Sequence, residues 1–195
     1  MRSRPRPLVI AALTATAALA SAAVPVLAAP SKPIVVRDAR GDVTGTLDLQ
    51  RFQLSLEEDR RLRAVVTFAG KVTAADMLAR SGPPGSVCLR VWTAEDADPA
   101  AARPDRLVCV TARTRAALRA TVLRQDGPGL PQRVGSAAIT ASKSDRSLII
   151  RFAQSDLGAP QRIRYGLEST RRGCQRPSCV DRAPGGPATR RFRLR

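Results

Sequence analysis

Apolar and polar residues alternate along most of the chain from residue 34 onward. The clearest run covers residues 61–68, where every second residue, from Leu62 to Phe68, is apolar. A period of two is typical of a β-strand with one face in the core and the other in solvent. Similar alternating runs, separated by turn-forming or charged segments, occupy residues 47–56, 87–92, 107–110, 118–123, 137–141, 148–152, 163–167 and 191–194, and residues 34–36 form a short apolar stretch.

These runs predict about nine short strands and little helix, a pattern typical of an antiparallel sandwich or barrel. Within residues 47–56 the alternation changes phase at Gln50 and Arg51, as a β-bulge would cause. At most one short helix is expected, near residues 73–80, with Thr73 as its cap. No repeat or linker divides the chain, so we expect a single all-β domain over residues 29–195.

Residues 1–28 have the features of a secretory signal peptide. Three arginines among the first six residues precede an apolar run that ends in small residues at Ala28. We expect cleavage after Ala28, because a cut one residue later would be followed directly by Pro30. The alternative is an uncleaved membrane anchor, since about 20 apolar residues can span a bilayer. After cleavage we expect no membrane span, and a protein that is secreted, extracellular or associated with the cell envelope.

Four cysteines follow the signal segment, which predicts two disulfides with three conceivable pairings. Strand parity selects one of them. Cys88 lies on the opposite face of its run from Leu89, and Cys109 lies opposite Val108. An antiparallel pair with Cys88 across from Cys109 therefore also places the two apolar residues across from each other. The remaining pair is Cys174 with Cys179; the alternative is a thiolate metal site, which the loose spacing and the absence of histidine disfavour.

The charge of the chain is strongly positive, with 33 lysines and arginines against 16 acidic residues and a net charge of +17. Histidine is absent, which excludes Ser-His-Asp and Cys-His catalysis and imidazole metal ligands. One tryptophan, one tyrosine and four phenylalanines are too few for a broad stacking platform. The cationic excess would attract polyanions outside the cell.

The order of several motifs is similar to that of known exported proteins. Asp38-x-x-Gly41-Asp42 precedes the run at 47–56, and Asp156-Leu157-Gly158 precedes the run at 163–167. This order resembles exported β-sandwich proteins of high-GC bacteria, loosely similar to DOMON domains and family-9 carbohydrate-binding modules. The resemblance covers residues 34–195 and implies a jelly-roll-like β-sandwich, not a particular reaction. The chain lacks the exposed aromatic residues with which sugar-binding relatives stack on their ligands.

Three aspartates near the first strand form a candidate metal site. Asp38, Asp42 and Asp48 bracket a glycine turn, and such a loop could offer calcium both carboxylate and backbone oxygens. The simpler interpretation is that these residues cap turns. Calcium is the one cofactor that the sequence leaves open, and otherwise none is expected.

Arginines recur at alternating positions in three strands. Parity places Arg61 with Arg63, Arg162 with Arg164, and Arg191 with Arg193, each pair on one strand face. These faces are candidate binding surfaces for an anionic polymer of the cell envelope, or simply solubilising surfaces.

The sequence therefore favours a non-enzymatic binding or interaction module of the cell envelope, whose partner is an anionic polymer or another exported protein. Export argues against nucleic acid as the physiological ligand. The alternative is a hydrolase of an envelope or extracellular polymer that uses carboxylates alone, with or without calcium, for which Glu57-Glu58-Asp59 and Glu95-Asp96-x-Asp98 are the candidate acids. Because these acids fall in turns, where carboxylates are usually solvated, no catalytic residue is singled out. A purely structural role is the third possibility.

Overall fold

The computed structural model describes residues 32–39, 41, 43, 45–79, 81–142, 144–173 and 177–194. The predicted signal segment 1–28, Asp42 and Cys174 lie outside the described residues, so the predictions that involve them stay predictions. Within the described ranges, no helix is long and apolar enough to cross a membrane.

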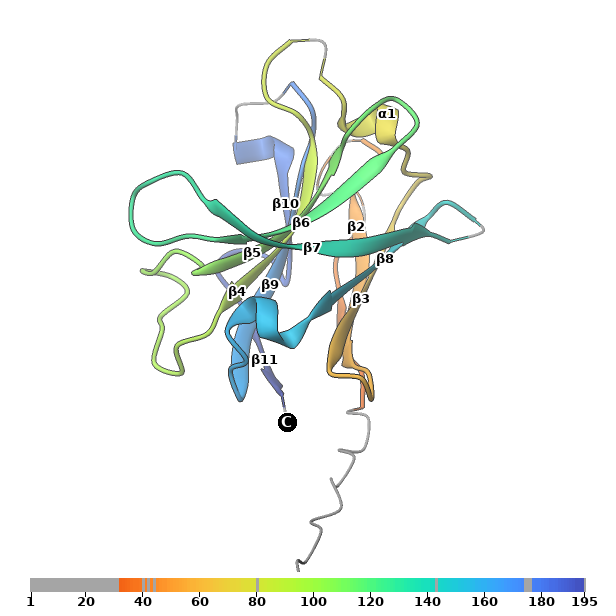
Figure 1. Ribbon diagram of the computed structural model, residues 1–195. Coiled ribbons are helices and arrows are strands. Elements are labelled where there is room, and N and C mark those ends of the chain that lie inside the picture. The colour runs from red at the N-terminus through yellow and green to blue at the C-terminus, as the bar shows by residue number, and fades with distance from the viewer. Residues whose placement is uncertain are drawn as a thin grey trace, which may run out of the picture.

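The described residues form eleven β-strands, one short α-helix and two 3-10 turns (Figure 1). The strands are β1 (Ile34–Arg37), β2 (Leu49–Leu56), β3 (Arg61–Phe68), β4 (Ser86–Trp92), β5 (Arg106–Ala112), β6 (Leu118–Arg124), β7 (Gln132–Ala141), β8 (Ser147–Ala153), β9 (Arg162–Thr170), β10 (Val180–Ala183) and β11 (Arg190–Arg193). The helix is α1 (Ala74–Met77), and the 3-10 turns are η1 (Gln154–Leu157) and η2 (Pro177–Cys179).

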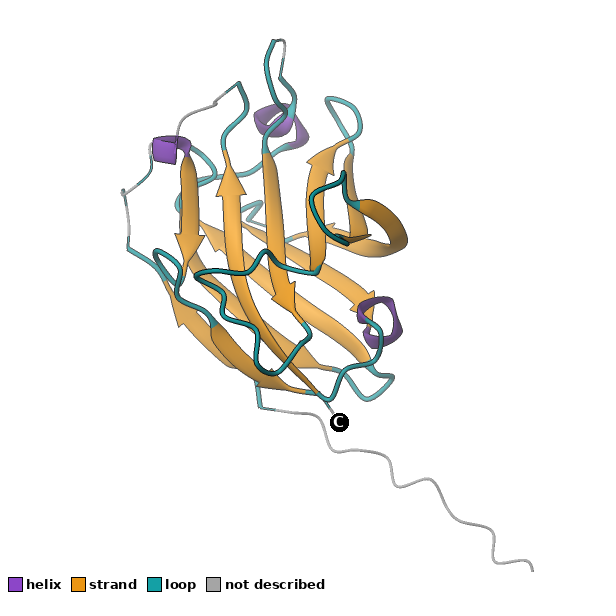
Figure 2. Ribbon diagram, turned by 90° about the vertical axis from the view of Figure 1, so that its left-hand side faces the viewer, coloured by secondary structure: helices purple, strands orange, loops and turns teal. Residues whose placement is uncertain are grey.

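All strand pairs are antiparallel and belong to one sheet with the order β1-β2-β3-β8-β7-β6-β5-β4-β9-β10, while β11 pairs with β9 beside β10. The long strand β7 connects two layers, because its residues 138–141 pair with β8 and its residues 132–137 pair with β6. Figure 2 shows the strands of the two layers crossing at an angle. The sheet is therefore a nearly closed, antiparallel sandwich, as the alternating pattern predicted.

The predicted number of about nine strands was too low. Strand β10 is the clearest case, because its inward positions are occupied by Asp181 and Ala183 instead of two large apolar residues. A strand that buries an aspartate leaves no alternation of hydrophobicity in the sequence. The predicted bulge is confirmed by the register shift between Leu49 and Arg51, and the predicted helix is confirmed as α1.

The core lies between the two layers and is built from the inward residues of nearly every strand. Three aromatic rings bridge it: Phe52 of β2 contacts Tyr165 of β9 edge to face at 5.6 Å between ring centroids, and Tyr165 contacts Phe192 of β11 at 6.4 Å. All three side chains are buried. Their packing ties β9 and β11, which carry the candidate site, to the opposite layer.

The first predicted disulfide is confirmed. Cys88 of β4 and Cys109 of β5 are direct neighbours in the strand register, with 4.1 Å between their Cα atoms and a bond between their sulfurs. The same register places Leu89 across from Val108, as strand parity required. Cys179 is buried, and its predicted partner Cys174 is the cysteine outside the described residues.

Side-chain hydrogen bonds close the seam between β2 in one layer and the β9–β10 pair in the other. The Ser169 hydroxyl donates to the backbone carbonyl oxygen of Leu47 at 2.6 Å, and the backbone N–H of Leu49 donates to Asp181 Oδ2, also at 2.6 Å. Ser169 and Asp181 are almost fully buried, at 2% and 1% exposure. These buried polar contacts take the place of a regular strand ladder at the point where the sheet almost closes.

Candidate anion-binding groove

Four arginines face outward from the β9–β11 pair. The antiparallel register sets Arg164 across from Arg191 and Arg162 across from Arg193. The residues between them, including Ile163 and Phe192, are buried at 2% and 3% exposure and point into the core. Because residues two apart share a strand face, burial of these apolar side chains sends all four guanidinium groups to the outer face.

These arginines line a cavity of about 380 Å³. Ile34 of β1 and the residues Ala94 and Glu95, from the loop after β4, complete its lining. We call this cavity the arginine groove and define it by the residues Ile34, Ala94, Glu95, Arg162, Ile163, Arg164, Arg191, Phe192 and Arg193.

The charge in the arginine groove is poorly balanced. Glu95 is its one acidic lining residue, and its carboxylate lies 3.8 Å from Arg162 Nε in an ion pair whose two side chains are more than half exposed. Arg164, Arg191 and Arg193 make no ion pair with any described residue. The Nε–H of Arg164 is also buried, without a hydrogen-bond acceptor among the described residues. The groove thus offers more positive charge and more donors than the protein itself satisfies.

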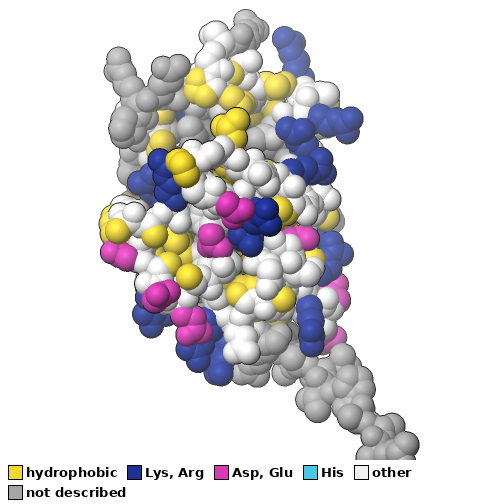
Figure 3. All heavy atoms as spheres, turned by 60° about the vertical axis from the view of Figure 1, so that its left-hand side comes forward, with side chains coloured by type: hydrophobic (Ala, Val, Ile, Leu, Met, Phe, Trp, Pro, Cys, Tyr) yellow, Lys and Arg dark blue, Asp and Glu magenta, His cyan; other side chains and the backbone are white. Residues whose placement is uncertain are grey.

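Two other groups of neighbouring arginines on the sheet are balanced by carboxylates, whereas Arg37 and Arg51, which face each other on β1 and β2, make no ion pair with any described residue. Arg63 and Arg151, which face each other on β3 and β8, both approach Glu57 Oε1, at 4.0 and 3.2 Å. Over much of the face shown in Figure 3, basic and acidic side chains lie close together. The positive charge of the protein is therefore not a uniform coat of unpaired arginines.

A second group of arginines that is balanced by a carboxylate lies in the same layer as the groove. Arg90 of β4 and Arg182 of β10 both approach Glu168 Oε2, at 3.6 and 3.0 Å. Burial lowers the pKa of Arg90, and the Glu168 carboxylate acts against that shift. Arg90 also lies over the Trp92 ring, 5.0 Å from its centroid. Here the Glu168 carboxylate balances both arginines, whereas Arg164, Arg191 and Arg193 of the arginine groove have no carboxylate partner among the described residues.

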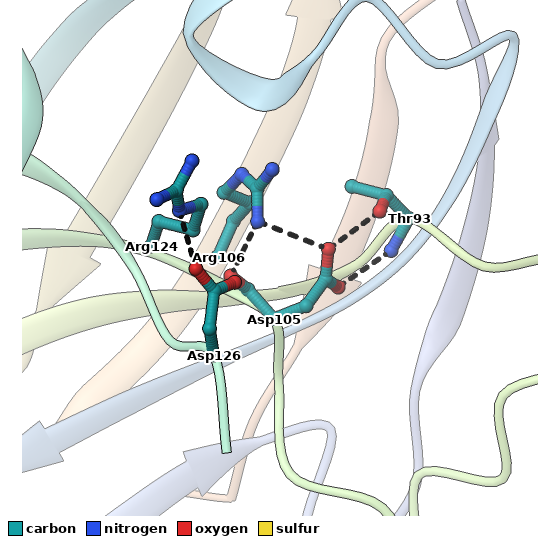
Figure 4. Close-up of polar contacts among 5 residues, drawn as sticks. All are labelled: Thr93, Asp105, Arg106, Arg124 and Asp126. Atoms are coloured by element: carbon teal, nitrogen blue, oxygen red, sulfur yellow. Dashed lines mark hydrogen bonds and ion pairs between the residues drawn. The ribbon is translucent and has the colours of Figure 1, made fainter. Parts of the chain in front are cut away.

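Polar contacts hold the loop that carries Ala94 and Glu95 in place (Figure 4). Asp105, at the end of this loop, accepts hydrogen bonds from the backbone N–H and the hydroxyl of Thr93 at its start, at 2.8 and 2.5 Å. Arg106 lies 3.4 Å from the same carboxylate. The indole N–H of Trp92 donates to the carbonyl oxygen of Ala102 at 3.0 Å, so the middle of the loop is fixed as well. These contacts give the groove wall a defined position.

The six arginines selected from the sequence fall into two separate groups. Arg162, Arg164, Arg191 and Arg193 meet in the arginine groove, whereas Arg61 and Arg63 lie on β3 in the other layer. Sequence reasoning did not place Ile34 beside these arginines, and it named Glu95 only as a candidate acid of the alternative hydrolase, because both residues reach the groove only through tertiary structure. It also missed the role of Asp105, although an aspartate directly before a strand is a signal for a loop-end contact.

The calcium site predicted at Asp38, Asp42 and Asp48 is not shown. Asp48 is buried, and its Oδ2 accepts a hydrogen bond from the backbone N–H of Gly41 at 3.0 Å, as a turn-capping residue does. Among the described residues, no group of three or more acidic or cysteine side chains is arranged to hold a metal ion. Because Asp42 lies outside these residues, the calcium site stays a prediction.

Comparison with known proteins gives no relative from which a function could be transferred. The chain matches no known family model, and no curated protein matches it.

Proposed function

We propose that this protein is a secreted, non-enzymatic binding module of the cell envelope and that its arginine groove binds an anionic polymer. The main support is the arrangement of four outward arginines in two facing pairs, around a cavity that contains one carboxylate. An anionic ligand would supply the acceptors that these guanidinium groups lack.

The arrangement has no evident benefit for folding. Like charges that face each other across two strands destabilise a sheet. At Arg63 and Arg151 this repulsion is relieved by Glu57, but Arg164 and Arg191 have no such shared acid. Residues that oppose stability and line a cavity are better explained by ligand binding than by structure.

Guanidinium chemistry indicates the class of ligand. The planar fork of arginine binds carboxylates, phosphates and sulfates through paired hydrogen bonds. The facing pairs at Arg162/Arg193 and Arg164/Arg191 are two residues apart along β9, a spacing of roughly 6.6 Å at the usual rise of a strand. The two facing pairs are therefore close enough to contact the same anionic unit of a polymer.

The Cys88–Cys109 disulfide is compatible with an extracellular location, where such bonds persist. The net charge of +17, or +14 without the three arginines of residues 1–28, would draw the protein toward the acidic polymers of an envelope. Both observations support an exported binding module without identifying the polymer.

The proposal can be tested with fluorescein-labelled dextran sulfate as a general polyanion. Anisotropy titrations compare the exported protein with the variant Arg164→Gln/Arg191→Gln and with the control Arg115→Gln/Arg119→Gln, which removes two exposed arginines outside the groove. We expect the groove variant to lose at least tenfold in affinity and to have a shallower salt dependence, because fewer counterions are released. Equal losses in the two variants, or binding that persists undiminished in molar salt, would overturn the proposal.

A second pair of variants tests the sign of the electrostatic argument. Glu95→Gln removes the one carboxylate of the groove and should raise the affinity for dextran sulfate about twofold to fivefold, the range of an exposed ion pair. Asp96→Asn makes the same charge change one residue further along the same loop, outside the groove lining, and should have a smaller effect. A decrease in affinity for Glu95→Gln contradicts the proposal.

A further inference from the structure

We propose that the arginine groove continues past Arg193 into a second, mainly uncharged subsite, and that the two together bind a polymer in which anionic units alternate with uncharged, hydroxyl-bearing units. This inference rests on the proposed function and specifies its ligand.

Arg193 lines both cavities. On one side it belongs to the arginine groove, and on the other it borders a cavity of about 470 Å³. The second cavity is formed by the turn between β2 and β3, by η1 and the segment after it, and by Arg193 and Leu194. Both volumes lie within the range of small-ligand sites, so each could hold about one unit of a polymer.

The chemistry of the second cavity differs from that of the groove. Its lining offers the hydroxyl of Ser155 and the side-chain amides of Gln154 and Gln161, together with one acid, Asp59, and two bases, Arg60 and the shared Arg193. Amides and hydroxyls both donate and accept hydrogen bonds, so they suit the hydroxyl groups of an uncharged unit.

The segments around the second cavity are held by backbone contacts, so its shape does not depend on the side chains of Ser155 and Gln161. The N–H of Gln154 donates to the carbonyl oxygen of Arg60 at 3.2 Å, and the N–H of Leu194 donates to the carbonyl oxygen of Gln161 at 2.7 Å. The Gln154 amide is fixed by its hydrogen bond to the Pro160 carbonyl oxygen at 3.0 Å. The side chains of Ser155 and Gln161 make no hydrogen bond to any described residue.

The backbone of this cavity is also in an unfavourable conformation. Arg60 and Ala159 both line it, and both have positive φ angles, of 60° and 50°. A non-glycine residue in this region costs about 1 kcal/mol or more, and such conformations concentrate at functional sites. The facing arginines of the neighbouring groove are likewise unfavourable for the stability of the fold.

Two defined oligomers separate this inference from simple charge attraction. A hyaluronan hexasaccharide alternates carboxylate-bearing and uncharged units, whereas a galacturonate hexamer carries a carboxylate on every unit. We expect the exported protein to bind the hyaluronan hexasaccharide at least as tightly as the galacturonate hexamer in isothermal titration calorimetry, although hyaluronan has half the charge. Galacturonate binding that is tenfold or more tighter would overturn the second subsite and leave charge alone as the determinant.

Variants of the second cavity provide the complementary measurement. Ser155→Ala/Gln161→Ala removes two exposed polar groups without touching the backbone contacts, and should weaken hyaluronan binding about fivefold to tenfold, as expected for the loss of one or two hydrogen bonds. The same variant should leave galacturonate binding within twofold of the wild type. The control Gln132→Ala/Ser144→Ala removes the same residue types at exposed positions outside both cavities and should change neither affinity.

The two proposals fail in different ways. If Arg164→Gln/Arg191→Gln binds both oligomers as the wild type does, the arginine groove itself is wrong. If that variant loses both ligands while Ser155→Ala/Gln161→Ala loses neither, the groove stands and the second subsite is overturned.

Discussion

Removal of the Cys88–Cys109 disulfide should lower the free energy of unfolding by about 3 kcal/mol. The two cysteines are separated by 21 positions in the sequence, and the loss of loop-closure entropy for a loop of that size gives about 3 kcal/mol. For a domain of this size the same loss lowers the melting temperature by about 6–12 °C. Because the bond joins directly facing residues of β4 and β5, the native register should survive its removal.

The measurement is urea unfolding of the variant Cys88→Ala/Cys109→Ala. Trp92, the one tryptophan of the chain and 2% exposed, reports the transition by fluorescence. The m-value should rise, because an unfolded chain without the cross-link exposes more surface. A change below about 1 kcal/mol with an unaltered m-value would refute this reasoning.

The effect of the lost bond can be separated from that of the lost sulfur atoms. In the background Cys174→Ser/Cys179→Ser, a reductant can open only the Cys88–Cys109 bond while every side chain keeps its size. Oxidised and reduced forms of that variant should differ by the same amount of about 3 kcal/mol.

Tyr165→Phe should leave the free energy of unfolding unchanged or raise it by up to about 1 kcal/mol in urea unfolding, because the buried phenol oxygen has no hydrogen-bond partner in the described part of the chain. Burial raises the pKa of Tyr165, the one tyrosine of the chain, above its ordinary value of about 10. Because the unfolded chain then releases the phenol proton at a lower pH than the folded protein, the wild type should lose stability above about pH 10. An ultraviolet absorbance titration should show no phenolate before the protein unfolds. Ser169→Ala should cost about 1–2 kcal/mol in thermal unfolding, because it breaks the buried hydrogen bond at the seam, whereas the exposed Ser155→Ala should change stability by less than about 0.5 kcal/mol. Gly85→Ala should lower the free energy of unfolding by about 1–3 kcal/mol, because the added Cβ atom would lie 3.0–3.1 Å from backbone atoms of three other residues. Gly129→Ala is the matched control, because its Cβ atom would have no neighbour within 4 Å. Equal melting temperatures of these two variants would contradict the packing argument.

Much of the fold could be predicted because two independent constraints agreed. Strand parity placed Leu89 and Val108 on the core face, and pairing of the cysteines on the other face then gave the observed register of β4 and β5. The phase change at Gln50 likewise predicted the bulge in β2, because the side-chain period of a strand is strict. Local periodicity is sufficient for features of this kind.

The closure of the sheet could not be predicted in the same way. It depends on Asp181 and Ser169, which are polar residues at inward positions, and on their contacts with residues more than a hundred positions away. A hydrophobicity pattern assigns such residues to the solvent face. Their burial is stable because backbone groups of β2 satisfy them, and that partnership exists only in the folded chain.

The candidate site was predictable in part. Parity placed Arg162 with Arg164 and Arg191 with Arg193, but it could not show that β11 lies beside β9, because strand order is a tertiary property. For the same reason the sequence could not separate Arg61 and Arg63 from the other four arginines, although the structure places both in the other layer, where Arg63 lies beside Glu57. Whether a row of arginines is balanced depends on neighbours that the local sequence does not contain.

The location of bound polyanion tests the central claim most directly. In a nuclear magnetic resonance titration with short, unlabelled dextran sulfate, the Nε–Hε signals of the arginine side chains report each guanidinium group separately. We predict that the largest shifts occur at Arg162, Arg164, Arg191 and Arg193, and that they reverse when salt is added. Shifts of equal size at Arg61 and Arg63, or shifts spread evenly over all exposed arginines, would contradict a binding site in the arginine groove.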